Sequence, residues 1–256
     1  MGETLKAGRG LSSKTIKWIA MITMAVDHTA VAIVETMIYS GTGAFGEKLY
    51  LLYEIMRDVG RLAFPLFIWL LAEGFFRTHS RAKYLLGMAV FSVISEIPFD
   101  LALMISPERF SVMFDNSHQN IYFTLTIGLL CMIISERILG KFEKPNPAFQ
   151  ALVAVLAAVC GGALAELLNT DYGAVGVAAI MAAYMMRRNG LKDLELPAAV
   201  GVLLFSSLTE GYAVADCFVV RASNGSRGNI RHKWLYYVFY PAHLAVLALI
   251  KFLIFA

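Results

Sequence analysis

Residues 17–39 read KWIAMITMAVDHTAVAIVETMIY, an apolar run that is interrupted near its middle by Asp27 and His28. A bilayer core needs about 20 apolar residues per helix, so this run is long enough to cross a membrane. It is too long for the apolar region of a signal peptide, and no small-residue cleavage site follows it, so we expect a retained first span. The run therefore predicts a membrane helix with ionisable groups near its centre.

The composition of the whole chain resembles that of this first run. Of 256 residues, 58% are hydrophobic and 16% are charged, and the mean hydropathy is +0.64. Soluble domains are about half apolar and about a quarter charged. We therefore expect an all-α, polytopic membrane protein. The formal net charge is only +3, and no basic stripe alternates with aromatic residues, so we expect no nucleic-acid partner.

Apolar runs of this kind recur along the chain and predict about eight transmembrane helices in one integral membrane domain, residues 1–256. The expected spans are 17–39, 58–76, 84–106, 119–139, 148–168, 171–187, 196–220 and 234–255. Lys and Arg cluster in the amino-terminal segment and in alternate loops, which is typical of the cytoplasmic side of a membrane. The sequence therefore predicts a cytoplasmic amino terminus, with residues 1–14 as a tail, and a multi-pass protein of the inner (cytoplasmic) cell membrane.

The seventh loop, residues 221–233, departs from this pattern. Eight spans place it outside, yet it carries several basic residues, among them Arg221 and Arg227. One interpretation is a miscounted or re-entrant helix around Glu210 and Asp216. The other is an anion-binding loop, because the sequence 224–228, Asn-Gly-Ser-Arg-Gly, allows the backbone to approach a charged group closely.

Asp27 and His28 lie where an ionisable side chain costs at least about 2.5–3.5 kcal/mol to insert. A carboxylate beside a histidine can orient the ring and raise its basicity, which is what a general base requires. We therefore expect Asp27 and His28 to be catalytic. The alternative is a buried pair that only locks two helices together.

Two arginines lie one helical turn apart at the start of the second expected span. Arg57 and Arg61 share one face of a helix, and paired guanidinium groups can bind a phosphate or a carboxylate. The alternative is an interfacial pair whose charges reach the lipid headgroups. We expect a substrate-binding role.

The third and fourth spans also carry polar groups. Glu96 and Asp100 flank Pro98, and Asn120 opens the next span. A kinked, polar helix of this kind normally lines a cavity in a membrane protein. We expect these three side chains at a binding site, with structural pairing to an arginine as the alternative.

The last span begins with an aromatic cluster. Tyr236, Tyr240 and His243 follow i, i+4, i+7 spacing, so they share one face, and Pro241 predicts a kink beside them. An interfacial aromatic belt with a buried histidine explains the same pattern. Cys131, Cys160 and Cys217 form no C-x-x-C pair, so we expect no metal site.

Three blocks of sequence together resemble the TraX family of integral membrane proteins. They are Lys17-x-Ile-Ala-Met-Ile-Thr-Met-x-x-Asp27-His28, then Arg57-x-x-Gly60-Arg61-x-Ala-Phe64-Pro65 with Glu73-Gly74-Phe75, and Asn224-Gly-x-Arg227-Gly228 with Tyr240-Pro241-x-His243-Leu244. The resemblance extends in order along almost the whole chain and is weakest between 140 and 210.

This resemblance implies a membrane acetyltransferase. TraX of conjugative plasmids acetylates the amino-terminal amine of pilin, and the family is similar to larger membrane acyltransferases that use acetyl-CoA on polysaccharides. The implied partners are acetyl-CoA as donor, a pilin-like protein or a glycan as acceptor, and membrane lipid. On this view His28 is the base, oriented by Asp27. Arg57, Arg61 and Arg227 contact the CoA phosphates or the oxyanion, and Tyr240 and His243 line the donor channel.

Two other classes of function fit the same residues. A proton-coupled secondary transporter would use Asp27, His28, Glu35 and Glu96 as a proton relay. The two halves of the chain show no repeat of this charged pattern, which many transporters have. A non-catalytic membrane assembly factor would use the polar residues only to lock its helices.

Overall fold

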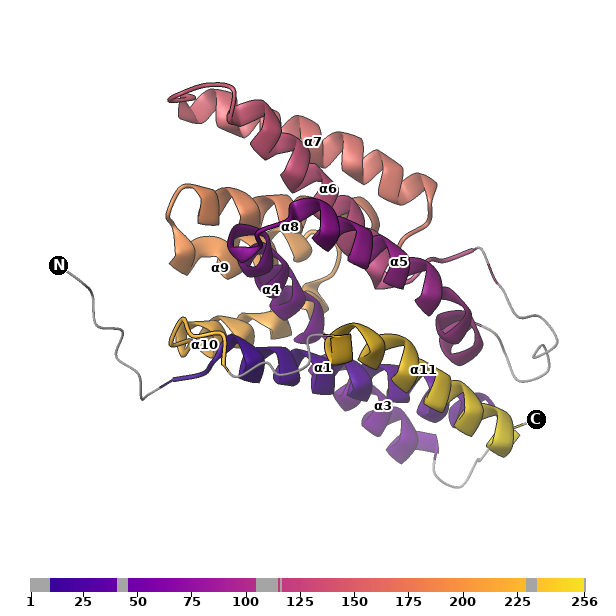
Figure 1. Cartoon of the computed structure of the whole chain (residues 1–256). Helices are drawn as coiled ribbons and strands as arrows, with labels where there is room; N and C mark the ends of the chain where they lie inside the picture. The colour runs from indigo at the N-terminus through magenta and orange to yellow at the C-terminus, as the bar shows by residue number, and fades with distance from the viewer. Residues whose placement is uncertain (1–9, 41–45, 105–114, 116, 229–233, 256) are drawn as a thin grey trace.

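The computed structural model describes residues 10–40, 46–104, 115, 117–228 and 234–255 (Figure 1). Within these ranges the fold is all-α, as the sequence predicts, with two isolated β-bridges and no strand. The expected tail 1–14 therefore lies mostly outside the described residues. Arg231, Lys233 and the end of the expected span 84–106 also lie outside them.

The first apolar run forms one continuous helical span. Helix α1 covers Ser13–Thr29, a π-helical turn covers Ala30–Glu35, and α2 covers Thr36–Tyr39. Ser12 caps the start, because its hydroxyl accepts a hydrogen bond from the backbone N–H of Thr15. The π-turn begins two residues after His28, and such turns are frequent at functional sites in helices.

The second span is longer than the sequence predicts. Helix α3 covers Gly46–Gly60 and α4 covers Ala63–Arg77, so the helical segment begins well before residue 58. A Cβ atom at Gly60 would collide with the side chain of Asp27, so α3 approaches α1 closely only because this position is glycine. The break between α3 and α4 therefore lies beside the carboxyl end of α1.

The next four helices form an antiparallel series. Helix α5 covers Arg81–Phe99 and runs into a π-helical turn, Asp100–Met104. The others are α6, Ile121–Leu139; α7, Pro147–Leu167; and α8, Gly173–Arg188. Glycines allow these helices to approach closely, since a Cβ at Gly161 would meet Cys131 and one at Gly176 would meet Thr124 and Phe64.

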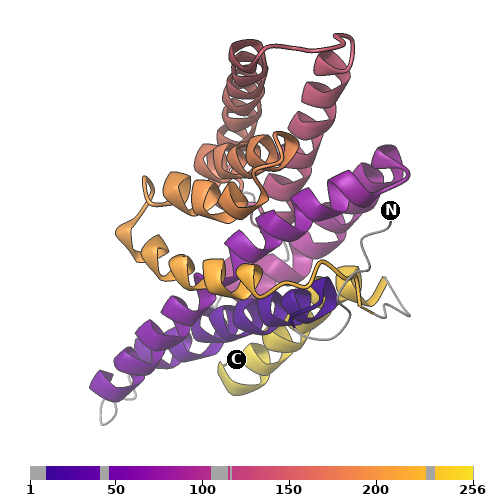
Figure 2. The same ribbon diagram turned by 90° about the vertical axis from the view of Figure 1, so that its left-hand side faces the viewer.

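The predicted span 196–220 is wrong as one continuous helix. The segment forms α9, Glu195–Leu203, a 3₁₀ turn, Leu208–Val214, and α10, Ala215–Arg221. Helix α10 contacts both α9 and α4, and the chain turns back between the two short helices (Figure 2). This segment is therefore a re-entrant hairpin, which is one of the two interpretations of the seventh loop. The last helix, α11, covers Trp234–Phe255.

The structure differs from the eight expected spans at the segment 196–220, which is a hairpin. Six helices in the described part of the chain are long and apolar enough to cross a membrane. They are 13–39, 46–77, 81–104, 121–139, 147–167 and 234–255. Helix α8 has only 16 residues, but it runs from beside the start of α6, where Gln119 pairs with Thr170, to the ion pair of Arg188 with Glu136 near the end of α6. It therefore also returns the chain to the amino-terminal face, whereas the hairpin of α9 and α10 does not cross.

The re-entrant hairpin explains the basic seventh loop. The backbone N–H of Ser13 donates to the carbonyl oxygen of Ser226 at 2.9 Å, and that of Lys14 donates to Arg227 at 3.2 Å. The loop therefore lies where α1 begins, which we call the amino-terminal face (left in Figure 1). Eight spans would place this loop on the outer side of the membrane, and that placement is wrong. The basic residues of the loop lie with the other basic clusters, on the face that the positive-inside rule assigns to the cytoplasm.

The core lies between α1, α4, α5, α6, α8 and α11. Its largest fully buried side chains include Phe75, Ile68, Leu129, Met132 and Tyr184. Many large apolar side chains are exposed, such as Val159 on α7 and Leu253 on α11, as expected for helix faces that contact lipid. The polar side chains that enter this core build the site described next.

Candidate active site

Two histidines from opposite ends of the chain meet at the centre of the molecule. Nδ1 of His28, on α1, lies 2.7 Å from Nε2 of His243, on α11. The rings are nearly parallel, with an angle of 5° between their planes, and His28 is 9% exposed. The sequence suggests a role for each histidine separately, and the fold brings them together.

The hydrogen bonds of the pair assign its protons. Nδ1 of His243 lies 2.9 Å from the carbonyl oxygen of Phe239, which can only accept, so this Nδ1 carries a proton. Nε2 of a neutral His243 is then an acceptor, and Nδ1 of His28 donates to it. This arrangement leaves Nε2 of His28 with a free lone pair, which is the state that a general base needs.

Asp27 is held by an arginine rather than by its neighbour in sequence. Both carboxylate oxygens of Asp27 accept from Nη1 of Arg57 at 2.7 Å. Both side chains are only partly exposed, at 26% for Arg57 and 21% for Asp27, and their pairing offsets the cost of this partial burial. The ring of His28 is oriented by His243, so the expected orientation by Asp27 does not match the geometry.

Arg61 forms the second ion pair of this region. Its Nη1 lies 2.8 Å from Oε1 of Glu210, on the 3₁₀ turn of the re-entrant hairpin. The Glu210 side chain is 2% exposed, whereas that of Arg61 is 27% exposed. This pair ties the tip of the hairpin to the break between α3 and α4. From the sequence, Glu210 indicates only a miscounted or re-entrant helix, and its partner Arg61 is 149 positions away.

A cavity of about 380 Å³ lies beside these pairs, and we call it the outer cavity. It lies between the carboxyl end of α5, the start of α8 and the tip of the hairpin, away from the amino-terminal face. Its polar lining residues are Asp27, His28, Arg57, Arg61, His118, Asp171, Tyr172, Ser206, Ser207 and Glu210. Nearly every charged group of this cavity lies close to an opposite charge, so the outer cavity is polar without a strong net charge.

His118 and Asp171 line the side of the outer cavity that is formed by the loop before α6. Nε2 of His118 lies 3.6 Å from Oδ1 of Asp171. The bond to this carboxylate raises the pKa of His118 above its ordinary value. Neither residue was predicted as a site residue, because they are 53 positions apart in the sequence.

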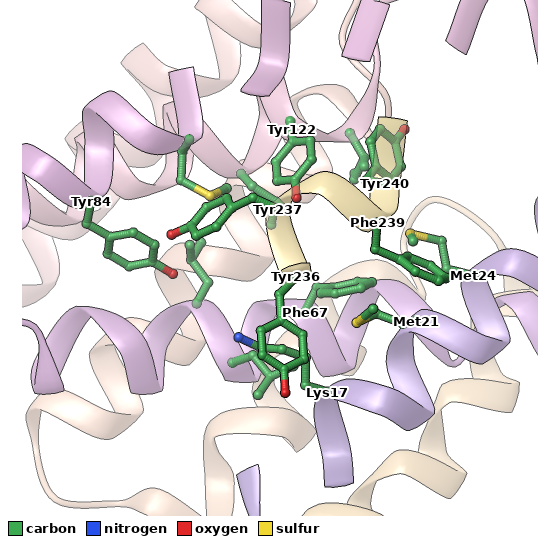
Figure 3. A pocket seen from close by; sticks show the side chains of 15 residues that line it. Lys17, Met21, Met24, Phe67, Tyr84, Tyr122, Tyr236, Tyr237, Phe239 and Tyr240 are labelled. Atoms are coloured by element: carbon green, nitrogen blue, oxygen red, sulfur yellow. The ribbon is translucent and has the colours of Figure 1, made fainter. Parts of the chain in front are cut away.

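A second, narrow cavity approaches the histidine pair from the other side and is lined by Tyr240, and we call it the aromatic channel (Figure 3). Its volume is about 100 Å³, and its lining combines apolar side chains with several tyrosines. The aromatic residues are Phe67, Tyr84, Tyr122, Tyr236, Tyr237, Phe239 and Tyr240. Tyr240 packs against His28, with 5.7 Å between ring centres, so the channel ends one ring away from the histidine pair.

The aromatic channel opens into a third cavity of about 470 Å³ at the amino-terminal face, the basic cavity. Lys17, Leu70, Tyr84, Tyr236 and Tyr237 line both spaces. The basic cavity is also lined by Arg77, His79, Lys83 and Arg227. Apart from Arg227, none of these basic groups is among the predicted site residues. The basic composition of the segment 77–83 marks them in the sequence, but in a loop it indicates membrane orientation as readily as a binding site.

Lys17 stands at the junction of channel and basic cavity. Its ammonium group lies 4.6 Å from the ring centre of Tyr236, and Figure 3 shows the two side chains side by side. Arg227 and Arg77 lie farther out and hold the loop in place. Nη2 of Arg227 donates to the carbonyl oxygen of Arg77 at 3.0 Å, and Nη2 of Arg77 donates to that of Gly225 at 2.8 Å.

The remaining predicted residues form a separate polar cluster behind the site. Asn120 donates to a carboxylate oxygen of Glu96 and to the carbonyl oxygen of Ser92, while Asp100 accepts from the backbone N–H of Asp115 at 2.9 Å. Glu96, Asp100 and Asn120 are all buried and line none of the three cavities. In this position they brace the junction of α5 and α6. Across the residues that the structure describes, no group of three or more His, Cys, Asp and Glu could hold a metal ion.

Two comparisons with known proteins cover nearly the whole chain. The family model described as TraX protein matches residues 12–251. The chain is 28% identical to the probable fimbrial assembly protein FimC, serogroup H1, of Dichelobacter nodosus, over 94% of this chain and 96% of that protein. No solved structure matches the chain significantly. The match of the family model over nearly the whole length shows that the chain belongs to the TraX family.

Proposed function

We propose that the chain is a membrane acetyltransferase that moves an acetyl group from acetyl-CoA, bound at the amino-terminal face, to an acceptor in the outer cavity. The observation that carries the proposal is the position of the histidine pair. His28 lines the outer cavity, and Tyr240, at the inner end of the aromatic channel, packs against it. A general base must lie within hydrogen-bond reach of the proton that it accepts. At His28 the base would lie between the route of the donor and the route of the acceptor.

The donor side matches the chemistry of acetyl-CoA. The phosphates of CoA would bind among Lys17, Arg77, Lys83 and Arg227 in the basic cavity, because ammonium and guanidinium groups bind phosphates well. The slender pantetheine arm contains amides and apolar segments, which suit a channel of tyrosines and methionines. The inner membrane of a bacterium, with its cytoplasmic face toward CoA, fits this orientation.

The acceptor side suits an amine or hydroxyl group of a larger molecule. The outer cavity opens away from the basic face and offers carboxylates, hydroxyls and guanidinium groups for hydrogen bonds. The name of the Dichelobacter relative refers to fimbrial assembly. We therefore propose a pilin-like protein as the first acceptor to test, and a glycan as the second.

The chemistry can proceed in one direct step. Nε2 of His28 accepts the proton of the acceptor amine or hydroxyl as that group attacks the thioester carbonyl carbon. The tetrahedral oxyanion collapses, the carbon–sulfur bond breaks, and the CoA thiolate leaves and takes up a proton from the His28 imidazolium. Arg57, at 26% side-chain exposure in the wall of the outer cavity, is the cation best placed to stabilise the oxyanion. Asp27 holds this arginine in place.

A non-catalytic assembly factor is the second candidate, because the name of the relative describes assembly and no reaction. The histidine pair and the ion pairs would then only hold α1, α3, α11 and the hairpin together. An assembly factor does not need to bind acetyl-CoA in any of the three cavities. A binding and turnover measurement therefore separates the two functions.

The experiment incubates the purified protein with radiolabelled acetyl-CoA and a membrane extract that contains candidate acceptors. We expect label in the acceptor fraction, a loss of about 10²–10⁴-fold in rate for His28→Ala, and weaker donor binding for Lys17→Ala. Ile22→Ala is the matched control, since Ile22 lies on the same helix and is 57% exposed toward lipid. A folded protein that neither binds nor turns over acetyl-CoA contradicts the enzyme and favours the assembly factor.

A further inference from the structure

The aromatic channel and the outer cavity do not join. Among the described residues, no side chain lines both spaces, whereas five line both the channel and the basic cavity. The channel therefore communicates with the amino-terminal face and the outer cavity with the opposite face. Between them stands a wall of a few side chains.

Tyr240 forms the centre of this wall. It is 3% exposed, and its ring lies 5.6 Å from that of His243 and 5.0 Å from that of Tyr122, measured between ring centres. The ring of Phe239 stacks on the other side of His243 at 5.0 Å. The Tyr240 ring, which lines the channel, thus packs against the ring of His28, which lines the outer cavity.

We propose that the ring of Tyr240 is a water barrier that separates the thioester from the outer cavity until an acyl acceptor displaces it, so that the acceptor, and not water, reacts with the thioester. The inference rests on the proposed function for the identity of the donor. Water that reached the thioester through the outer cavity would attack its carbonyl carbon, with release of acetate and CoA thiol and consumption of one water molecule. Closed sites prevent such hydrolysis by excluding water from the reactive group.

The ring, and not the hydroxyl group, carries this role. The contacts of Tyr240 with His28, His243 and Tyr122 are all ring contacts. Tyr240→Phe preserves the ring and should keep the ratio of hydrolysis to transfer seen in the unaltered protein. Tyr240→Ala removes the ring and should raise that ratio by about tenfold or more, since it connects the two spaces.

The ratio is measured with purified protein, radiolabelled acetyl-CoA and an acceptor. It is the amount of labelled free acetate divided by the amount of labelled acceptor. Tyr240→Leu is the second variant, because its apolar side chain preserves the core if the alanine variant does not fold. Tyr50→Ala removes a tyrosine that is 58% exposed on α3 and serves as the control. An unchanged ratio in folded Tyr240→Ala and Tyr240→Leu overturns the barrier.

A second measurement does not depend on any acetyltransferase activity. In protein whose three cysteines are replaced by alanine, Met88→Cys places a thiol in the aromatic channel and Leu103→Cys places one in the outer cavity. A small anionic methanethiosulfonate, attracted by the basic cavity, is added to one face of sealed vesicles at a time.

With Tyr240 intact, we expect labelling of Met88→Cys only from the amino-terminal face and of Leu103→Cys only from the opposite face. Adding Tyr240→Ala should let the reagent reach Leu103→Cys from both faces. Labelling of both positions from both faces with Tyr240 intact contradicts the barrier. If the unaltered protein transfers no acetyl group, the proposed function fails, and the labelling still decides whether the wall exists.

Discussion

Nδ1 of His28 and Nε2 of His243 lie 2.7 Å apart, although 215 positions separate the two residues in the sequence. The bond joins the centre of the first span to the last helix, two residues after Pro241. It leaves Nε2 of His28 unprotonated, with a lone pair that can accept a proton. If the proposed function holds, His243 positions the ring and His28 acts as the base.

The first prediction tests this division of roles. His243→Ala should lower kcat by roughly 10- to 100-fold with little change in KM, because loss of an orienting partner typically costs this much activity. His243→Gln should recover part of the loss, since its amide oxygen can accept from Nδ1 of His28. Steady-state kinetics over a range of pH provides the measurement. A merely structural His243 would lower stability in both variants and leave the pH profile of the folded enzyme unchanged.

The second prediction concerns the ion pair between Arg61 and Glu210. Arg61→Met leaves a carboxylate that is 2% exposed without its partner, so it should cost about 3 kcal/mol of stability. Glu210→Leu should cost less, because the arginine it leaves behind is more exposed. Combining the two changes should restore part of the stability lost by Arg61→Met. Thermal unfolding in detergent measures all three variants, and strict additivity of the two single changes speaks against the pair.

The helical class and most of the spans could be predicted from the sequence because they depend on local composition. Long apolar runs such as 17–39 and 234–255 are long and apolar enough to cross a membrane as helices. The run 196–220 has similar hydropathy, but Glu210 and Asp216 within it are buried in the fold, where the chain turns back. Hydropathy alone does not distinguish a crossing helix from a re-entrant hairpin.

The site could be predicted only residue by residue. Asp27, His28, Arg57, Arg61 and His243 stand out because charged and polar groups are costly within apolar runs. Their pairing depends on how α1, α3 and α11 pack, so adjacency in sequence wrongly suggested that Asp27 orients His28. The lysines and arginines of the basic cavity lie in loops where such residues are common, and nothing in their local sequence marks them as binding groups.

The third prediction tests the position of the seventh loop. Ser226→Cys should react with an impermeant thiol reagent only from the side that holds the amino terminus, because Ser226 accepts from the backbone of Ser13. Replacement of the three native cysteines removes the background. Reaction from the opposite side would contradict this position and would indicate that the segment 196–220 crosses the membrane.

The fourth prediction follows from the raised pKa of His118. Its bond to Asp171 favours the protonated ring, so the NMR titration midpoint of His118 should lie above its ordinary value of 6.5. The stabilisation is present at pH values below that ordinary value and is lost as pH rises through the higher, folded-state value. Because His118 is 41% exposed, the effect on stability should be below about 1 kcal/mol. Asp171→Asn should return the midpoint toward 6.5, and an unchanged midpoint in that variant contradicts the assignment.

The central claim is that an acetyl group passes from the amino-terminal face to the opposite face at His28. The most direct measurement uses vesicles with the protein in one known orientation, radiolabelled acetyl-CoA on the amino-terminal face and a peptide with the amino-terminal sequence of a pilin on the other. We predict labelled peptide in this arrangement, about 10²–10⁴-fold less with His28→Ala, and none when the donor is placed on the opposite face. Equal labelling by His28→Ala, or labelling only when the donor is on the opposite face, would contradict the account.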